Sequence, residues 1–288
     1  MSDKAAIGAG VLYVVATPIG NLGDITARAL ETLRRVAVIA AEDTRHARHL
    51  LTHFGIQAEL VAYHEHNETD NAPKLLARLE GGQDLALVSD AGTPLISDPG
   101  FVLVRLARER GLRVVPIPGA NAAICALSAA GLPSDRFLFL GFPPRTSAKC
   151  REWLAGLAGE TATLILYESG KRAERTLGDL AAVLGPRQAV VARELTKRFE
   201  TFLSGGLEEL AGRLAKDEEQ RLGELVLLVA GAEAGAGAAQ AREEERVLGI
   251  LAAELPLKQA AGLAARITGG SKNRLYQVGL GLSAGKDR

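Results

Sequence analysis

The sequence predicts an α/β fold with two successive sheets and a small helical tail. In residues 11–132, apolar strand-like runs alternate with helical patterns, which is typical of a mostly parallel sheet covered by helices on both faces. In residues 137–231 the alternation is less regular, and TKRFETFLSGG (196–206) has the pattern of a hairpin, so we expect a mixed sheet. From residue 242 onward only helical patterns occur.

The first half contains five expected strands, each followed by an expected helix. The strands lie at 11–16, 37–42, 59–65, 84–90 and 113–119, and the helices at 25–36, 44–55, 71–82, 101–111 and 120–132. In parallel sheets of this kind, ligands bind outside the carboxyl ends of the strands. The long turns after the first, fourth and fifth strands should therefore lie at a ligand-binding edge.

The second half and the tail complete the expected domain organisation. Strands are expected at 137–142, 161–169, 188–196, 201–205 and 223–231, with helices at about 148–158, 171–184 and 207–216. The stretch AEAGAGAAQA is small and poor in large apolar residues, as linkers are. We expect an N-terminal domain (1–119), a second α/β domain (120–231), a linker (232–241) and a helical unit (242–288).

Length and composition exclude several classes of protein. The chain has 288 residues, and its 34 basic and 34 acidic side chains cancel, so net charge indicates neither a nucleic acid nor a membrane as partner. Two cysteines, Cys125 and Cys150, are too few for a disulfide framework. The first residues lack the zones of a signal peptide, and no apolar run reaches the ~20 residues of a membrane span. We therefore expect a soluble, cytoplasmic protein.

The helical unit carries a local charge that the zero total conceals. Between Leu255 and Arg288 there are six basic residues and one acidic residue. A basic helix-turn-helix-like unit suits a phosphate backbone. A small cap packed on the main body is an equally good interpretation of the composition alone.

The turn TPIGNLGDIT (17–26) follows the first strand. Gly20 and Gly23 would let the backbone approach a ligand closely, and Asp24 suits a helix cap. The turn is not a GxGxxG dinucleotide fingerprint, and the chain has no P-loop motif. These absences disfavour a nicotinamide enzyme and a nucleoside triphosphatase.

The turn SDAGTPLISDPG (89–100) is the most informative stretch. Gly92 and Pro94 impose a bend, Thr93 and Ser97 supply hydroxyls, and the flanking aspartates suit an ammonium group or a helix cap. An ordinary strand-to-helix connection needs only a few residues, so this length favours a binding loop over a purely structural one. The mixture suits a small ligand with charges of both signs.

Two further stretches carry candidate polar chemistry. All five histidines lie between residues 46 and 66, yet no zinc-ligand spacing occurs, so we expect no metal site. His64 and His66, in HEHNE, stand at a strand end and could meet a polar substrate or move a proton. Asp43 and Arg45, in AEDTRHAR, end the neighbouring strand, where a helix cap with solvated charges is a serious rival interpretation.

Taken together, these segments resemble one family. The stretches VATPIGNLGDIT, AEDTR, YHEHNE, LVSDAGTPLISDPG, VVPIPGAN, YESGKR, ARELTKRFE and GELVLLVAG stand in the order and spacing of the bacterial small-subunit ribosomal RNA methyltransferases I, which are cytidine-2′-O-methyltransferases of the tetrapyrrole methylase superfamily. The resemblance covers residues 9 to 231, and the basic tail resembles the extra C-terminal unit of the family. It implies the two-domain class III methyltransferase fold, a homodimer, and a small-subunit 16S rRNA substrate.

The resemblance also implies S-adenosylmethionine as the methyl donor, held in the cleft between two domains. Carried over residue by residue, it places the donor against the first turn, the fourth-strand turn and the second domain. The expected contacts are Thr17, Pro18, Ile19, Gly20, Gly92, Thr93, Pro94, Ile96, Ser97, Asn121, Ala122, Tyr167, Glu168 and Glu194.

For catalysis and RNA binding, the sequence supports hypotheses only. A base or orienting group is expected among His64, His66 and Asp43, with Arg45 on a substrate phosphate. RNA contacts are expected from Arg145, Lys171, Arg172, Lys258, Arg266, Lys272 and Arg274. The alternatives are a tetrapyrrole methylase, a diphthine-synthase-like protein methylase and a non-enzymatic RNA-binding assembly factor. A Gly-Asp-Pro turn would favour the first, and this chain has SDAGTP instead.

Overall fold

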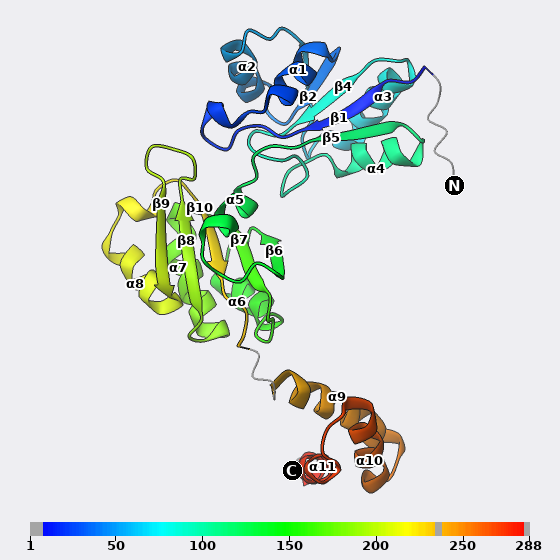
Figure 1. Ribbon diagram of the computed structural model, residues 1–288, viewed down its shortest axis with the longest axis vertical. Helices are drawn as coiled ribbons and strands as arrows, with labels where there is room; N and C mark the ends of the chain where they lie inside the picture. Colours follow the sequence, from blue (N-terminus) through cyan, green and yellow to red (C-terminus); the bar gives the residue numbers. More distant parts are fainter. Residues whose placement is uncertain (1–7, 234–237, 285–288) are drawn as a thin grey trace. The chain divides into compact units, whose positions relative to one another are not determined.

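The computed structural model describes residues 8–233 and 238–284, with side chains described for 8–233 and 243–279 (Figure 1). The described chain forms two compact units. The larger contains the residues up to Gly156 and Ala162–Ala230, and the smaller contains Leu157–Thr161 and the residues from Gly231 onward. Each unit is described by itself.

The first sheet of the larger unit is wholly parallel, as the alternation predicted. Its order is β3-β2-β4-β1-β5. The central strands β2 and β4 are buried along their whole length because helices cover both faces. The strands are β1 (Val11–Val15), β2 (Val38–Ala41), β3 (Glu59–Ala62), β4 (Leu85–Val88) and β5 (Arg113–Ile117).

Four helices cover the two faces of this sheet (Figure 1). Leu33 of α1 and Leu51 of α2 pack with Val15 and Ile39 on one face, whereas Leu76 of α3 and Leu103 of α4 pack on the other. Successive strand residues belong to opposite clusters, as the two-residue period of a strand requires. The helices are α1 (Ala27–Arg35), α2 (Thr44–His53), α3 (Glu68–Glu80) and α4 (Phe101–Glu109), and a 3₁₀ turn, η1 (Leu22–Asp24), precedes α1.

The strand order reverses between β4 and β1. These two strands are neighbours, but the chain leaves β1 toward β2 on one side and leaves β4 toward β5 on the other. A parallel sheet opens a crevice at such a point, outside the carboxyl ends of the strands. The turns 16–26 and 89–100 both leave the sheet here, so the topology brings the two most informative sequence motifs together.

The second sheet is mixed, as predicted, with the order β6-β7-β10-β8-β9. Only the β6–β7 pair is parallel, and β8 and β9 form the expected antiparallel pair. Helix α5 covers one face through Ala126 and Leu127, and α7 and α8 contact strands of this sheet as well. The elements are α5 (Ala122–Ala129), β6 (Phe137–Gly141), α6 (Ser147–Ala155), β7 (Thr163–Ser169), α7 (Gly170–Leu184), β8 (Gln188–Arg193), β9 (Thr201–Gly206), α8 (Leu207–Lys216), η2 (Glu219–Arg221) and β10 (Glu224–Val229).

The smaller unit contains three helices, α9 (Ala238–Glu254), α10 (Leu257–Thr268) and α11 (Lys272–Ala284). Leu248, Ala261 and Leu275, one from each helix, meet in its core. Residues 238–241, which we expected in the linker, are helical, because alanine and glutamine are good helix formers. Residues 234–237 of that expected linker lie outside the described residues. The remaining domain boundaries stay predictions.

Across the described ranges, no helix is both long and apolar enough to cross a membrane.

Candidate active site

The three long turns at the edge of the first sheet are tied together by hydrogen bonds. Thr17 N donates to Gly92 O at 2.8 Å, and Gly92 N donates to Thr17 O at 3.1 Å. The Thr93 hydroxyl then donates to Ala120 O in the turn after β5, at 3.0 Å. Because Thr17 is only 3% exposed, water does not compete for these bonds. The edge is therefore one continuous, braced surface.

Backbone strain concentrates in two loops, one at this edge and one after β8 of the second sheet. In the part of the chain that the structure describes, four residues other than glycine have left-handed φ values: Leu95 (73°), Ser97 (68°), Glu194 (50°) and Thr196 (65°). Each such conformation costs roughly 1–2 kcal/mol, and strain of this kind gathers at ligand-binding sites. It also explains why the strand expected over 188–196 ends at Arg193.

Two glycines make the close packing of this edge possible. Gly92 has a φ of 82°, and a Cβ there would lie 3.3 Å from Cγ2 of Ile19. A Cβ on Gly20 would lie 2.5 Å from Cγ of Lys197, in the strained loop after β8. Any larger residue would push the first turn away from its neighbours.

The two strained loops and the first turn line a cavity of about 300 Å³, here called cavity A. Its volume is at the lower end of the range for small-molecule sites. Its lining is mainly apolar, with an aromatic wall and a smaller polar part. The apolar wall contains Ala122, Phe142, Tyr167, Leu195 and Val226, and the polar part includes Ser97, Asp98, Glu194 and Lys197.

Tyr167 is held at the apolar wall by contacts on two sides. Its ring meets those of Phe139 and Phe142 edge-on, with centroids 4.9 and 5.6 Å away. Its hydroxyl oxygen accepts a hydrogen bond from Ala123 N at 3.2 Å, and burial raises the pKa of the phenol. A planar, apolar surface held in this way suits an aromatic ring of a ligand.

Asp98 supplies negative charge to cavity A. The pKa of its carboxyl is raised to about 6, mainly by burial and also by the nearby carboxylates of Glu42 and Asp90, which together outweigh a hydrogen bond from Ser89. Burial, with Asp90 nearby, also raises the pKa of Glu42. Carboxylates crowded in this way are stabilised by a bound cation. The site therefore favours a ligand with positive charge.

A second cavity of about 480 Å³, here called cavity B, opens beside cavity A. The two cavities share four lining residues, namely Ile19, Ala91, Lys197 and Glu224. Cavity B is also lined by the first turn and by residues of α2, including His46 and His49.

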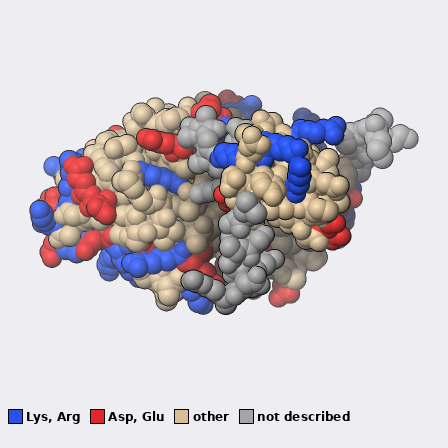
Figure 2. Space-filling view, turned by 90° about the horizontal axis from the view of Figure 1, so that it is seen from below, with Lys and Arg blue, Asp and Glu red and all other residues tan. Residues whose placement is uncertain are grey.

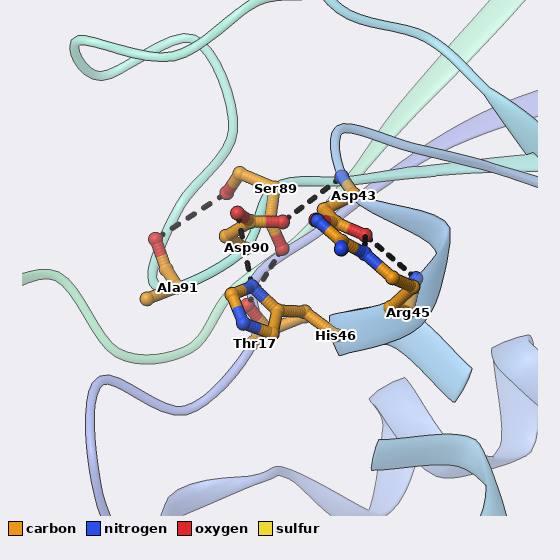
Figure 3. Close-up of polar contacts among 7 residues, drawn as sticks. All are labelled: Thr17, Asp43, Arg45, His46, Ser89, Asp90 and Ala91. Carbon is orange, nitrogen blue, oxygen red and sulfur yellow. Dashed lines mark hydrogen bonds and ion pairs between the residues drawn. The ribbon is translucent and has the colours of Figure 1, made fainter. Parts of the chain in front are cut away.

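The start of α2 is a network of charges beside cavity B (Figure 3). The Asp43 carboxylate accepts from Arg45 N at 2.8 Å, which caps the helix, and from the Arg45 guanidinium at 2.6 Å. These bonds hold the pKa of Asp43 well below its usual range. Asp90 Oδ1 accepts from Asp43 N at 3.0 Å, and Asp90 Oδ2 lies 3.1 Å from His46 Nδ1. Asp43 is therefore the N-cap of α2, as the alternative interpretation of the sequence proposed.

His64 and His66 line neither cavity. The strand expected over 59–65 ends at Ala62, because Asn67 folds back: its Oδ1 accepts from His64 N at 2.8 Å and its Nδ2 donates to Ala62 O at 3.1 Å. His64 Nε2 lies 3.1 Å from the same amide, and His66 is exposed. The catalytic roles expected of His64 and His66 stay predictions, and neither side chain is part of the lining of cavity A or cavity B.

Glu168 is buried, and its carboxylate already has partners. It accepts from Thr176 Oγ1, Ser169 N and the guanidinium of Arg172 at 2.7 to 2.8 Å. These bonds anchor the start of α7 and account for both oxygens, although Glu168 also borders cavity A. Of the RNA contacts expected in this region, Arg145 and Lys171 are exposed, whereas Arg172 is engaged in this ion pair.

Glu194 holds the strained loop after β8 against the second sheet. Burial raises its pKa, but a hydrogen bond from Glu224 N and the ammonium of Lys197, both at 3.0 Å, outweigh burial and lower the pKa overall. Lys197 also donates to the Glu224 carboxylate at 2.9 Å. Hydrogen bonds and ion pairs therefore hold together the wall that the two cavities share.

Comparison with known proteins identifies the fold and the family. The model of the family "Tetrapyrrole (Corrin/Porphyrin) Methylases" matches residues 11–211, and that of "RsmI C-terminal HTH domain" matches residues 238–283. The chain belongs to the tetrapyrrole methylase family. Among solved structures, it resembles the methyltransferase CobJ, with a TM-score of 0.58 and 20% identity over 78% of this chain and 95% of that one.

Two further comparisons refine this membership. The chain is 56% identical to ribosomal RNA small subunit methyltransferase I of Pseudomonas aeruginosa, over 95% of this chain and 98% of the relative, and 56% identical to its namesake in Escherichia coli O157:H7, over 94% and 95%. A uroporphyrin-III C-methyltransferase from Thermus thermophilus, solved with S-adenosylhomocysteine, shares the fold with a TM-score of 0.53 and 19% identity over 76% of this chain and 97% of that one.

Nine of the fourteen donor contacts that the resemblance implied line cavity A or cavity B. Ile19, Ser97, Ala122, Tyr167, Glu168 and Glu194 line cavity A, and Thr17, Pro18, Ile19 and Gly20 line cavity B. Gly92, Thr93, Pro94, Ile96 and Asn121 line neither cavity. Among them, Thr93 braces the turn, and Asn121 caps α5 by accepting from Ile124 N at 3.2 Å.

In this family member, the three-helix tail carries a shallow groove of about 810 Å³. Lys258, Arg266 and Lys272, three of the four expected RNA contacts of the tail, line it. The fourth, Arg274, is ion-paired with the buried Glu244. Figure 2 shows that basic side chains gather in local groups even though the total charge is zero. Three of the basic residues counted in the tail therefore lie together at one groove.

Sequence reasoning missed two side chains of the site, His46 and Asp90, as a pair. They are 44 positions apart, and only the β2–β4 pairing brings them together. Phe142, at the apolar wall, was missed as well. Within the described side chains, no cluster of His, Cys, Asp or Glu is arranged to hold a metal ion.

Proposed function

We propose that this protein methylates the ribose 2′-hydroxyl of a cytidine in the decoding region of 16S rRNA, with S-adenosylmethionine as methyl donor. Methylation of small-subunit rRNA is the activity for which its nearly full-length relatives, 56% identical, are named. That similarity, over 95% of this chain and 98% of one relative, is the observation that carries the proposal. The choice of cytidine and of the 2′-hydroxyl is the finer part of it.

The residues of cavity A fit S-adenosylmethionine. The aromatic wall at Tyr167 and Phe142 suits a purine ring, and the crowded carboxylate of Asp98 suits a ligand with net positive charge. When bound, the donor supplies a methyl group activated by a positively charged sulfur. Ser97 and the backbone of the fourth-strand turn would hold its polar part.

The contribution of the chain to the reaction is mainly one of position. Methyl transfer to a hydroxyl requires the attacking oxygen, the carbon and the leaving sulfur to lie in line, and holding reactants in that geometry can supply much of the rate enhancement. The hydrogen bonds of Thr17, Gly92 and Thr93 hold the edge rigid before any ligand binds. The strained loops are held in the same way, so little order has to be created on binding.

RNA binding is assigned to exposed basic side chains outside the cavities. The target nucleotide has to leave its stack to enter a cleft, and phosphate contacts hold the surrounding RNA. Arg145, Lys171 and the tail groove of Lys258, Arg266 and Lys272 are available for these contacts. We also propose that the protein acts in the cytoplasm and that it forms a homodimer, the latter because the family resemblance implies one.

The test is methyl transfer from labelled S-adenosylmethionine to small ribosomal subunits and to naked 16S rRNA, both prepared without the modification. Digestion to nucleosides should give labelled 2′-O-methylcytidine, and fully modified subunits serve as the control that takes up no label. A different labelled nucleoside would refute the cytidine assignment. Donor binding without transfer to either RNA would refute the acceptor, and a tetrapyrrole would be the next acceptor to assay.

A further inference from the structure

His46 and Asp90 form a carboxylate–imidazole pair at the wall of cavity B (Figure 3). Asp90 Oδ2 lies 3.1 Å from His46 Nδ1, while Oδ1 of the same carboxylate accepts from Asp43 N at 3.0 Å. The backbone bond orients Asp90, and Asp90 in turn favours the imidazole tautomer that carries its proton on Nδ1. The lone pair of Nε2 is then free, and among the described residues no partner occupies it.

The position of this pair next to cavity A suggests a role in catalysis. Cavities A and B meet at Ile19 and Ala91. If cavity A holds the methyl donor, an acceptor in cavity B lies directly across this shared wall. A ribose hydroxyl is a weak nucleophile, so a base that removes its proton accelerates attack. His46 stands in the cavity where that proton would be released.

We infer that His46 is the general base of the methyl transfer and that Asp90 is its positioning residue. The inference rests on the proposed ribose methylation. As the 2′-oxygen forms its bond to the methyl carbon, the carbon–sulfur bond breaks and its electron pair stays on sulfur. The hydroxyl proton passes to Nε2 of His46, and Asp90 stabilises the resulting imidazolium. Because the His46 side chain is 64% exposed, water can then take the proton.

Other groups around cavity B are less suited to this role. Asp43 is held ionised by Arg45 and is therefore a weak base. Lys197 and Glu224, across the cavity, are bonded to each other at 2.9 Å. His49 lines the same cavity, but no carboxylate is paired with it among the described residues. Only His46 combines a position in cavity B with a partner that sets its tautomer.

A purely structural interpretation of the pair makes a different prediction. A side-chain hydrogen bond as exposed as this one contributes little to stability, so on that interpretation loss of His46 would change neither the fold nor the reaction. The test is the single-turnover rate of methyl transfer to unmodified small subunits with saturating donor. We expect His46→Ala to lower it about 10²- to 10⁴-fold, with donor and subunit affinities unchanged.

Two further variants separate chemistry from structure. Asp90→Asn keeps an oxygen for Asp43 N but loses the charge, and should slow transfer by roughly 10- to 100-fold, less than loss of the base itself. His53→Ala, on the same helix but outside both cavities, should keep the wild-type rate. Added imidazole should partly restore the His46→Ala variant. The acidic limb of the wild-type rate–pH profile should be absent in that variant, in which the charges of Asp43, Arg45, Asp90, Lys197 and Glu224 remain.

The outcomes distinguish this inference from the proposed function. If the wild-type protein yields 2′-O-methylcytidine and His46→Ala retains its rate within threefold, His46 is not the base and the proposed function stands. A slow variant that keeps the acidic limb and does not respond to imidazole would also overturn the inference. If the wild-type protein yields no such product, the proposed function fails and the inference falls with it.

Discussion

The edge of the first sheet and the groove of the tail show two different ways of building a surface for binding. At the edge, the turns after β1, β4 and β5 are bonded to one another, and the turn after β4 contains the strained residues Leu95 and Ser97. In the tail groove, Lys258, Arg266 and Lys272 are exposed. One surface is specified by backbone geometry and the other by charge.

The difference suits the two tasks that we propose for these surfaces. Transfer of a methyl group requires reactants to be placed within a fraction of an ångström, so the edge gains from rigidity. Holding a phosphate backbone requires positive charge at about the right spacing, and flexible lysine and arginine side chains suffice. We therefore expect changes of shape to disable the edge and changes of charge to weaken the groove.

Among the changes that compare the edge with the groove, the largest effect is expected from adding a branched side chain at the edge. Gly92→Val places a β-branched residue at a φ of 82°, with its Cβ 3.3 Å from Ile19. The backbone cost exceeds ~1–2 kcal/mol, so we expect donor affinity to fall roughly 30- to 100-fold by calorimetric titration. Gly55→Val is the control, since Gly55 has a φ of 63° and no atom within 4 Å of its Cβ position. Equal donor affinity in the two variants would show that the edge tolerates changes of shape.

The groove should respond to charge, with a smaller effect. Alanine at Lys258, Arg266 and Lys272 together should weaken binding to small subunits about 10-fold or more at low salt. The slope of log Kd against log salt should fall by about 2, because each phosphate contact contributes ~0.7–0.9. Arg246→Ala is the control, because Arg246 is exposed, paired with Glu243 and outside the groove. An unchanged slope would exclude the groove from RNA binding.

The negative charge of Asp98 should affect both donor binding at the edge and the stability of the protein. Asp98→Asn should weaken donor binding by about 5-fold at pH 7.5, because the ligand loses a carboxylate partner. The same change should raise the free energy of unfolding without donor by about 1 kcal/mol, because burial disfavours the charged carboxylate. The gain is this small because Asp98 is partly exposed and water screens its charge. Asp135→Asn, exposed and outside both cavities, is the control.

The pH dependence of this effect has a defined sign. Folding raises the pKa of the Asp98 carboxyl from 3.8 to about 6, so the folded state holds this proton more tightly than the unfolded state. The contribution of Asp98 to the free energy of unfolding therefore falls as the pH rises between these values. Chemical denaturation at several pH values should show this fall in the wild-type protein and not in Asp98→Asn. A parallel fall in both proteins would contradict it.

The smallest effect is expected at Tyr167. Tyr167→Phe removes the acceptor for Ala123 N but keeps the ring, so it should cost about 1 kcal/mol. The expected fall in Tm is roughly 2–4 °C, with donor affinity within about threefold. Tyr13→Phe loses an exposed hydrogen bond to Arg35 and should leave Tm unchanged. A large loss of donor affinity in Tyr167→Phe would mean that the hydroxyl itself contacts the ligand.

Most of the fold could be predicted from sequence, because periodicity reports which faces are buried. The continuous apolar runs around Ile39 and Leu87 predicted strands of a parallel sheet, and the structure places both strands inside the sheet, fully buried. The strand ends were wrong where a side chain or strained backbone competes with pairing. Asn67 ends β3 at Ala62, and the left-handed Glu194 ends β8 at Arg193.

The sequence by itself determined the two sheets, the edge turns and the excess of basic residues in the tail, because these follow from local pattern and composition. Only the tertiary structure decided which polar side chains face one another. Sheet pairing brought Asp90 to His46 across 44 positions, while the local turn at Asn67 left His64 outside the lining of both cavities. Contacts between distant residues depend on how strands are ordered, and that order is set by the packing of the whole domain.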